Sequence, residues 1–200
     1  MPSIEPQPSP FLTPEEYLVR ERAAEFKSEY LFGQVYAKSG GSPEHAAIAI
    51  NVGGELRAQL RGKPCQVFSS ELKVRIRSNG LFAYPDLSVA CGELEFHDGQ
   101  RDVLTNPTLI VEVLSPSTEN YDRGSKFFYY RQIEALQEYL LVSQHEPYID
   151  HYKKEAEGRW TLTSAAGLAS SLALPSIGVT LDLAEIYEKI AFPSPLKVIG

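Results

Sequence analysis

Two acidic residues lie where the surrounding sequence favours buried apolar side chains. Glu112 is a charged residue within the strand-like run 109–114, and Asp86 opens another strand-like run directly after Pro85. Burying an ionised carboxylate without a partner is very costly, so Glu112 needs a nearby cation, a hydrogen-bond donor or a raised pKa. Two carboxylates on neighbouring strands could together bind a divalent cation such as Mg²⁺, which takes oxygen ligands. The alternative is that Asp86 closes a turn and Glu112 pairs with a buried arginine or lysine.

Lys126 could supply a third chemical group. It lies in the segment 122–130, on a helix expected to follow the Glu112 strand, and it would share a helix face with Tyr130. An ammonium group beside two carboxylates and a metal could orient a water molecule and stabilise the charge of a phosphodiester transition state. Alternatively, Lys126 is a solvated side chain paired with Asp122, as most helix lysines are.

Local patterns predict the elements that must position these groups. The residues Thr-Pro-Glu-Glu at 13–16 predict a helix N-terminus with a capping box, and the helix should run to about residue 25. Two short strands should follow, with a turn near Gly33. A second helix should open near Pro43 with one apolar stripe, made of Ile48, Val52, Leu56 and Leu60.

The rest of the chain reads mainly as strands. Apolar or alternating runs predict strands at 71–77, after Asp86, and at 109–114, 138–143, 148–152 and 160–162, with helices at about 122–136 and 183–190. In the first of these strands, alternation separates three inward apolar residues from a basic face of Lys73, Arg75 and Arg77. We predict an α/β (α+β) fold with a mixed β-sheet core flanked by helices. Residues 1–12 should form a flexible N-terminal arm and residues 13–200 a single domain.

Composition excludes several classes of protein. The 200 residues are 43% hydrophobic and 22% charged, with a net charge of −7, which argues against a general nucleic-acid coat and a basic membrane-surface protein. The charge does not exclude a nucleic-acid enzyme, because an empty metal site adds negative charge. Cys65 and Cys91 make no disulfide framework and lack metal-ligand spacing. With neither a signal-peptide pattern nor a membrane-length apolar run, we expect a cytoplasmic protein.

Other common chemistries lack their sequence patterns. The chain has no phosphate-binding glycine loop and no dinucleotide fingerprint. The four histidines have no zinc-ligand spacing, and no nucleophile elbow of the Gly-x-Ser-x-Gly type is present. Carboxylate chemistry is therefore the best-supported interpretation.

The order Pro85-Asp86, then Glu112 in a Glu-Val-Leu run, then Lys126 resembles the PD-(D/E)XK phosphodiesterase superfamily. More narrowly, the chain is similar to a bacterial group of restriction endonucleases within that superfamily, whose biological role is largely unassigned. The narrower resemblance covers most of the ordered chain, at residues 29–33, 42–45, 85–87, 111–118, 122–130 and 138–140. It implies a restriction-endonuclease-like fold and a site in which Asp86 and Glu112 bind Mg²⁺.

The chain departs from the superfamily at one important position. Leu114 stands where a lysine usually follows the second acid by two residues, and the resemblance to the narrower group points to Lys126 as its replacement. The superfamily also often adds an acid from an early element. Glu29 is the first candidate for this acid and Glu71 the second, and His45 is a weaker site candidate.

We therefore expect a metal-dependent phosphodiesterase that acts as a DNA endonuclease. Asp86, Glu112 and the backbone carbonyl of Val113 would coordinate Mg²⁺ or Mn²⁺, and Lys126 would position the attacking water. The basic strand face could contact phosphates. The alternatives are a non-catalytic nucleic-acid-binding or structural relic of the nuclease fold, and a carboxylate-pair enzyme acting on sugars.

We also expect a homodimer, because two symmetric sites would cut both strands of a duplex most simply. Aromatic residues of the late strands could supply the contact or could belong to the core. These residues are Tyr148, Tyr152 and Trp160.

Overall fold

The computed structural model describes residues 11–192 apart from 39, 77–79 and 117. The helices are α1 (Pro14–Ala23), α2 (Pro43–Gln59), α3 (Glu119–Tyr121), the π-helical turn η1 (Asp122–Lys126), α4 (Phe127–Tyr130), the 3-10 turn η2 (Ala156–Gly158) and α5 (Leu183–Ile186). The first eight strands are β1 (Ser28–Leu31), β2 (Gln34–Ala37), β3 (Cys65–Ser69), β4 (Lys73–Ile76), β5 (Leu81–Ala83), β6 (Leu87–Cys91), β7 (Val103–Leu104) and β8 (Leu109–Val113). The later strands are β9 (Glu138–Val142), β10 (Tyr148–Lys154), β11 (Trp160–Ala166), β12 (Ser171–Leu174) and β13 (Val179–Asp182). Within the described residues, no helix is long and apolar enough to cross a bilayer.

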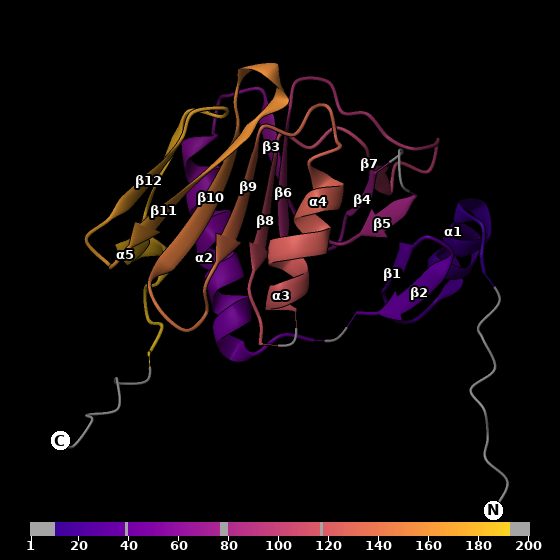
Figure 1. The fold of residues 1–200 in the computed structure, drawn as a ribbon, viewed down its shortest axis with the longest axis horizontal. Coiled ribbons are helices and arrows are strands. Elements are labelled where there is room, and N and C mark those ends of the chain that lie inside the picture. Colours follow the sequence, from indigo (N-terminus) through magenta and orange to yellow (C-terminus); the bar gives the residue numbers. More distant parts are fainter. Residues whose placement is uncertain (1–10, 39, 77–79, 117, 193–200) are drawn as a thin grey trace, which may run out of the picture.

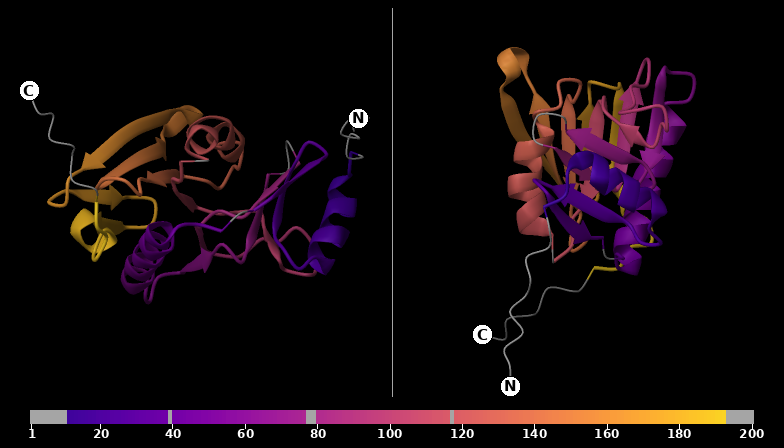
Figure 2. Two further views of the ribbon diagram at one scale, coloured as in Figure 1. Left: turned by 90° about the horizontal axis from the view of Figure 1, so that it is seen from below. Right: turned by 90° about the vertical axis from the view of Figure 1, so that its right-hand side faces the viewer.

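Two larger sheets organise these strands, and they confirm the predicted mixed architecture (Figures 1 and 2). One sheet has the order β2-β1-β5-β4-β7 and the other the order β11-β10-β9-β8-β6-β3. The central pair β8–β9 is parallel, whereas β6 runs antiparallel to β8. The parallel pairing needs a crossover connection, and α3, η1 and α4 lie in the segment that provides it.

A three-residue link connects the two sheets just before the candidate acid. Strand β5 ends at Ala83 in the five-stranded sheet, and β6 begins at Leu87 in the six-stranded sheet. Asp86 is the last residue of this link, directly after Pro85. The proline favours an extended backbone and offers no N–H donor, which suits a passage between two sheets.

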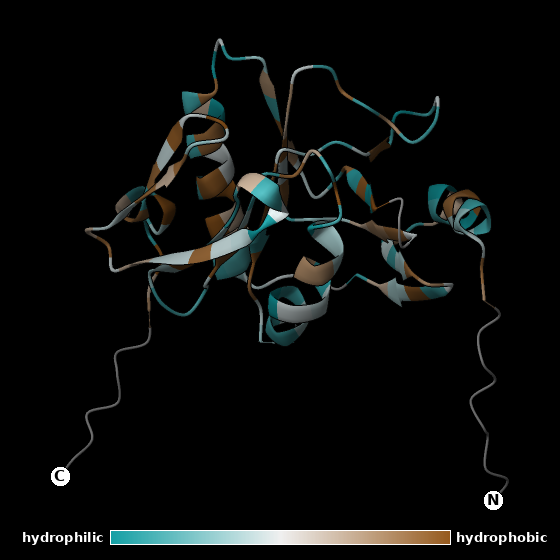
Figure 3. Ribbon diagram, turned by 45° about the horizontal axis from the view of Figure 1, so that its top comes forward, coloured by the Kyte–Doolittle hydropathy of each residue, from teal (hydrophilic) through white to brown (hydrophobic). Residues whose placement is uncertain are grey.

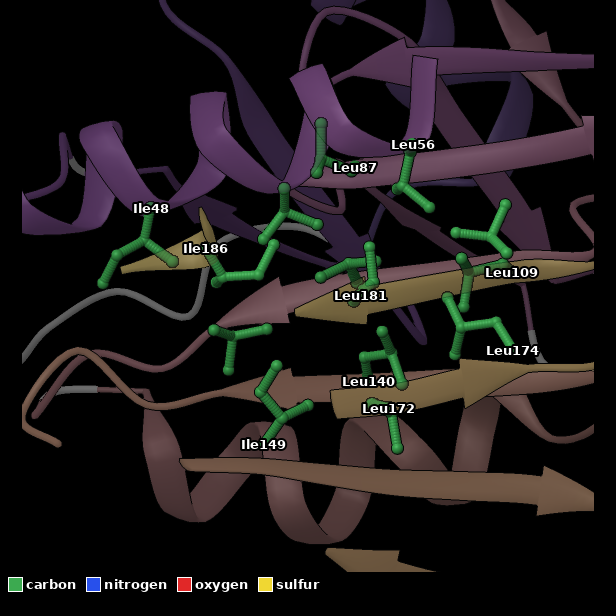
Figure 4. Close-up of a cluster of buried hydrophobic side chains, with 14 of the residues drawn as sticks. Ile48, Leu56, Leu87, Leu109, Leu140, Ile149, Leu172, Leu174, Leu181 and Ile186 are labelled. Atoms are coloured by element: carbon green, nitrogen blue, oxygen red, sulfur yellow. The ribbon is translucent and has the colours of Figure 1, made fainter. Parts of the chain in front are cut away.

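A large apolar core covers one face of the six-stranded sheet (Figure 4). The predicted stripe of α2 is buried, and Ile48, Val52 and Leu56 have no exposed surface. Figure 3 shows both polar and apolar residues along the same helix. A Cβ atom at Gly53 would lie 3.2 Å from a Leu87 methyl carbon. Gly53 therefore permits close packing of α2 against β6.

The opposite face of the sheet is covered by η1, α4 and the turns that follow them (Figure 1). Here the predicted helix 122–136 is wrong in extent, because regular helix ends at Tyr130. The amides of Ile133 and Leu136 instead donate to carbonyls three residues earlier, at Tyr130 and Ile133. These tight turns place every third side chain against the sheet, namely those of Tyr130, Ile133 and Leu136.

The N-terminal elements agree with their sequence signals. Thr13 caps α1, and its side chain and Glu16 form the reciprocal capping box. The β1–β2 hairpin turns at Phe32 and Gly33. Leu12, at the end of the expected arm, is buried, and its carbonyl accepts a hydrogen bond from the Tyr30 hydroxyl. The preceding residues 1–10 lie outside the described chain.

The β12–β13 hairpin and the cysteine pair differ from the sequence analysis. Segments 171–174 and 179–182 were not predicted as strands, although their three leucines and Val179 enter the core beside α2. Cys65 and Cys91 were expected to make no disulfide framework, but the structure joins the two residues in one disulfide bond. They are direct cross-strand partners in the antiparallel β3–β6 register, which their spacing in the sequence does not reveal.

The expected basic strand face is also corrected. Lys73 is buried, donates to the Tyr84 hydroxyl at 3.2 Å and lies 3.3 Å from an Asp102 carboxylate oxygen. Arg75 is half-buried, with its guanidinium 4.9 Å from the centre of the Phe82 ring. These two side chains are therefore engaged within the protein, and Arg77 lies outside the described residues.

The late aromatic residues pack inside the protein for the most part. Tyr152 and Trp160 contact the Phe127 ring, with centroid distances of 4.2 and 5.4 Å. Tyr148 donates a hydrogen bond to Asp150. Core packing therefore uses two of the three aromatics considered for a dimer contact.

Candidate active site

Glu112 is the buried centre of the candidate site. It is the fourth residue of β8, and it points to the same face of the sheet as Ile110 and Leu114, toward η1 and α4. Only 3% of Glu112 is exposed. The Tyr130 hydroxyl donates to Glu112 Oε1 at 3.1 Å, and Lys126 Nζ lies 2.8 Å from the same oxygen. The carboxylate thus has the partners that its burial requires.

Lys126 is the last residue of the π-helical turn η1, and its side chain reaches the site. The turn η1 is π-helical, with hydrogen bonds between residues five apart instead of four, and such turns often occur at functional sites. The Lys126 ammonium is buried, at 3.4 Å from Asp122 Oδ1 and 3.7 Å from Glu29 Oε1. The prediction that it lies beside the acid is confirmed for Glu112. The solvated alternative is wrong, although the predicted pairing with Asp122 is present.

Asp86 lies next to β8 through a backbone contact. The Val113 amide donates to Asp86 Oδ2 at 2.8 Å, which attaches the carboxylate to the residue that follows Glu112. His45 Nε2 lies 3.2 Å from the same oxygen, and Lys38 Nζ lies 3.8 Å from Oδ1. The structure therefore places Asp86, which directly precedes β6, beside the β8 residue that follows Glu112.

The pKa values reflect this crowding of buried charge. Burial raises the pKa of Glu112 to about 8, against the opposing influence of Lys126, and the charges of Asp86 and Asp122 raise it further. Burial also raises the pKa of Asp122. Burial alone would lower the pKa of Lys126, but the surrounding acids, led by Glu112, hold it well above its ordinary value. Without a metal, burial therefore makes Glu112 harder to ionise than an exposed glutamate.

Asp86 behaves differently because its partners are positive. Burial acts to raise its pKa, but His45 and Lys38, together with the Val113 amide, hold that pKa below the ordinary value. In turn, the hydrogen bond with Asp86 raises the pKa of His45. The site thus combines one carboxyl group that stays ionised with another that resists ionisation.

Glu29 and Glu71, the two candidates for an additional acid from an early element, differ in their distance from the site. Glu29, from β1 of the other sheet, accepts a hydrogen bond from the Tyr84 amide at 3.0 Å and faces Lys126. Glu71 pairs with Lys27, and its side chain is 78% exposed. The structure therefore brings Glu29 to the site and leaves Glu71 at the surface. His45 joins the site through Asp86.

Sequence reasoning missed two contributors. Asp122 was considered only as a surface partner, although its position four residues before Lys126 fits a shared face. Lys38 had no pattern that could have identified it, because it follows β2 and reaches Asp86 only through the tertiary fold. Its ammonium also donates to the Tyr84 carbonyl.

Two carboxyl groups of the site could together hold a hard divalent cation that takes its other ligands from water or substrate. Among the described residues, no group of three or more His, Cys, Asp or Glu side chains is arranged to hold a metal. Mg²⁺, however, is usually held by one or two carboxylates with water and substrate oxygens as its other ligands. Glu112 is a buried carboxyl group with a raised pKa beside a second carboxylate, so a cation would relieve the cost of its ionisation. Asp86 and Glu112 therefore fit such an ion.

The overall fold is similar to that of a protein of known structure. A crystal structure of a putative nuclease belonging to DUF820, from Anabaena variabilis, superposes with a TM-score of 0.72 at 17% sequence identity. The match covers 88% of this chain and 97% of that chain. It confirms the predicted restriction-endonuclease-like fold.

Sequence relationships place the chain more narrowly. Residues 14–184 match the Uma2 family, described as putative restriction endonucleases, and the chain belongs to this family. The uncharacterized protein slr1290 of Synechocystis is 40% identical over 185 residues, covering 92% of this chain and 96% of that protein. A second Synechocystis protein, uncharacterized sll1609, is 36% identical over 156 residues, covering 78% and 88% respectively. The resemblance inferred from the site residues is confirmed.

Proposed function

We propose that the protein is a metal-dependent phosphodiesterase that cleaves DNA internally. The observation that carries the proposal is the buried cluster of Glu112, Lys126 and Tyr130, joined to Asp86 through the Val113 amide. Keeping a carboxyl group and an ammonium group in the protein interior has a large desolvation cost. Perturbed, buried titratable groups of this kind are characteristic of functional sites.

Each side chain has a role in this proposal. Asp86 and Glu112, with the Val113 carbonyl, would hold Mg²⁺ or Mn²⁺, and the ion when bound would supply an activated water molecule and positive charge for the phosphate. Lys126 holds the attacking water or a phosphate oxygen through its ammonium group. Glu29 and Asp122 keep that ammonium protonated, and Tyr130 fixes the orientation of Glu112. His45 and Lys38 keep Asp86 ionised.

In this proposal Lys126 takes the role of the lysine that the superfamily usually has at position 114. Position 114 holds a leucine, which carries no charge and is buried in the apolar cluster under η1 and α4. The ammonium of Lys126 lies 2.8 Å from Glu112 and approaches it from the adjoining helix. This geometry supports the proposal that Lys126, from a different element, acts beside the Glu112 carboxylate.

The test is cleavage of supercoiled plasmid and circular single-stranded DNA with Mg²⁺, with Mn²⁺ and with EDTA. We expect metal-dependent nicking by the wild type and a loss of about 10²-fold or more in Glu112→Gln and Lys126→Met. Lys153→Met is the matched control, because Lys153 pairs with Glu155 at the surface. Equal nicking by all four proteins would indicate a contaminant and would contradict the proposal.

One observation favours a second candidate function, a nucleic-acid-binding protein without catalysis. Lys126 and the Tyr130 hydroxyl satisfy the buried acid within the protein, so the fold does not need a cation to tolerate it. DNA binding by the wild type without cleavage of any substrate in the presence of either metal would favour this candidate.

A further inference from the structure

A group of partly exposed aromatic rings adjoins the candidate site. Phe32 is 55% exposed and Phe128 is 51% exposed. Both rings contact the half-buried Tyr129, at centroid distances of 5.7 and 5.8 Å and near-perpendicular angles of 81° and 74°. We call Phe32, Phe128 and Tyr129 the aromatic ledge. The Arg131 guanidinium lies 4.6 Å from the centre of the Phe128 ring and adds positive charge to it.

Two residues of the ledge, Tyr129 and Phe32, lie close along the chain to residues of the site. Tyr129 directly precedes Tyr130, whose hydroxyl donates to Glu112. Phe32 follows Glu29 by three residues along the β1–β2 hairpin, a distance of about 10 Å at the rise of a strand. The hairpin and α4, which carry these residues, can be followed in Figure 1. We infer from this closeness along the chain that a nucleic acid strand with one phosphate at the acids would place a nearby base at the ledge.

The backbone under Phe32 is unfavourable for its side chain. Phe32 has φ +47° and Gly33 has φ +87°, so both central residues of the two-residue turn have positive φ. Such turns favour asparagine followed by glycine, and a bulky residue at positive φ is strained. The exposed ring makes an edge contact with Tyr129 and is not buried in a core that could offset this strain. Strain held at an exposed aromatic beside a site indicates a functional use of the ring.

We propose that the aromatic ledge binds an unpaired nucleobase, so that the protein prefers single-stranded or frayed nucleic acid to an intact duplex. This proposal rests on the proposed function. Aromatic side chains stack on any base, because every base has a π-face, and a cation beside the rings adds favourable interactions. A base inside a duplex has both faces already stacked, so it cannot present one to the ledge. Arg131 supplies the cation at this position.

The test is direct binding in EDTA, measured by fluorescence anisotropy with a labelled 12-nucleotide oligothymidylate and a labelled blunt duplex of the same length. The variant is Phe32→Asn, which removes the ring and gives the turn a residue that it favours. The matched control is Phe26→Asn, since Phe26 is 82% exposed and outside the ledge. We expect Phe32→Asn to bind the single strand about 5- to 150-fold more weakly, the range expected for one stacked base. Duplex binding should change by less than twofold, and Phe26→Asn should match the wild type.

Several results would overturn the proposal. These are no measurable binding of the single strand by the wild type, an equal loss on single strand and duplex, or an equal loss in Phe26→Asn. A change in sedimentation mass in Phe32→Asn would show instead that the ledge is a contact between copies of the chain. Because the assay needs no metal and no cleavage, its outcome is independent of the nuclease test. Selective loss of binding by a protein that cuts nothing would support the ledge and contradict the catalytic function.

Discussion

Replacing Glu112 by glutamine should change the way in which the stability of the metal-free protein depends on pH. Burial raises the pKa of Glu112 from an ordinary 4.5 to about 8. Between these pH values the folded protein retains a proton that the unfolded chain has released. The free energy of unfolding of the wild type therefore falls as the pH rises, by about 1.4 kcal/mol per pH unit at most. Over the whole interval the loss is on the order of 4 kcal/mol.

The glutamine variant lacks this titration but keeps the shape of the protonated acid. Its amide oxygen can still accept from Tyr130 and Lys126, the two partners of Glu112 Oε1. Lys126 adds no slope over this range, because its raised pKa keeps it protonated in the folded protein and it stays protonated in the unfolded chain until its ordinary pKa. The variant should therefore gain stability relative to the wild type steadily between about pH 5 and pH 8.

The assay is urea denaturation in EDTA at four pH values for the wild type, Glu112→Gln and Glu71→Gln. Glu71 is the control, because its side chain is largely exposed and pairs only at the surface with Lys27. The wild type and the control should give parallel stability curves. Parallel curves for the wild type and Glu112→Gln would refute the reasoning, because Glu112 would then ionise in the folded protein as it does in the unfolded chain.

Four further predictions follow from the same structure. Affinity for Mn²⁺, measured by calorimetry, should rise about tenfold per pH unit below pH 8, because binding must displace the proton of Glu112; a flat profile would contradict this. Tyr130→Phe should lower the free energy of unfolding by about 1 kcal/mol through loss of the buried hydrogen bond to Glu112, and an unchanged urea midpoint would argue against that bond. Reductant should destabilise the protein by about 3 kcal/mol, given the separation of 26 residues between Cys65 and Cys91, and should leave a Cys65→Ser/Cys91→Ser variant unaffected. A homodimer should give a sedimentation mass twice that of the 22.2 kDa chain at micromolar concentration, and a monomer mass would exclude it.

The parts of the site that the sequence could predict are those that depend on local patterns. A lone acid in an apolar run requires a partner whatever the fold, and a lysine four residues before a tyrosine shares its helix face. Glu112, Lys126 and Tyr130 could therefore be identified together before their distances were known. The capping box at Thr13 and the apolar stripe of α2 depend on equally local rules.

The missed features depend on register and on tertiary packing. The disulfide requires Cys65 to lie opposite Cys91, which follows from the pairing of β3 with β6 and from no pattern in either strand. Alternation correctly placed Val74 and Ile76 inward, but it could not show that a second layer, through Tyr84 and Asp102, would also bury Lys73. The π-helical turn that directs Lys126 has no sequence signature strong enough to displace the prediction of a regular helix.

The parallel pairing of β8 with β9 also sets the order in which the site can form during synthesis. The acid on β8 is enclosed only after β9, which ends at Val142, has been made and has joined the sheet. Glu29 comes from the other sheet, so assembly of the site requires contacts between segments more than 80 residues apart. A nascent chain that already contains all the acids would therefore still lack the enclosed site. A chain truncated before β9 should therefore contain these side chains without forming the enclosed site, even if the β1–β2 hairpin is stable.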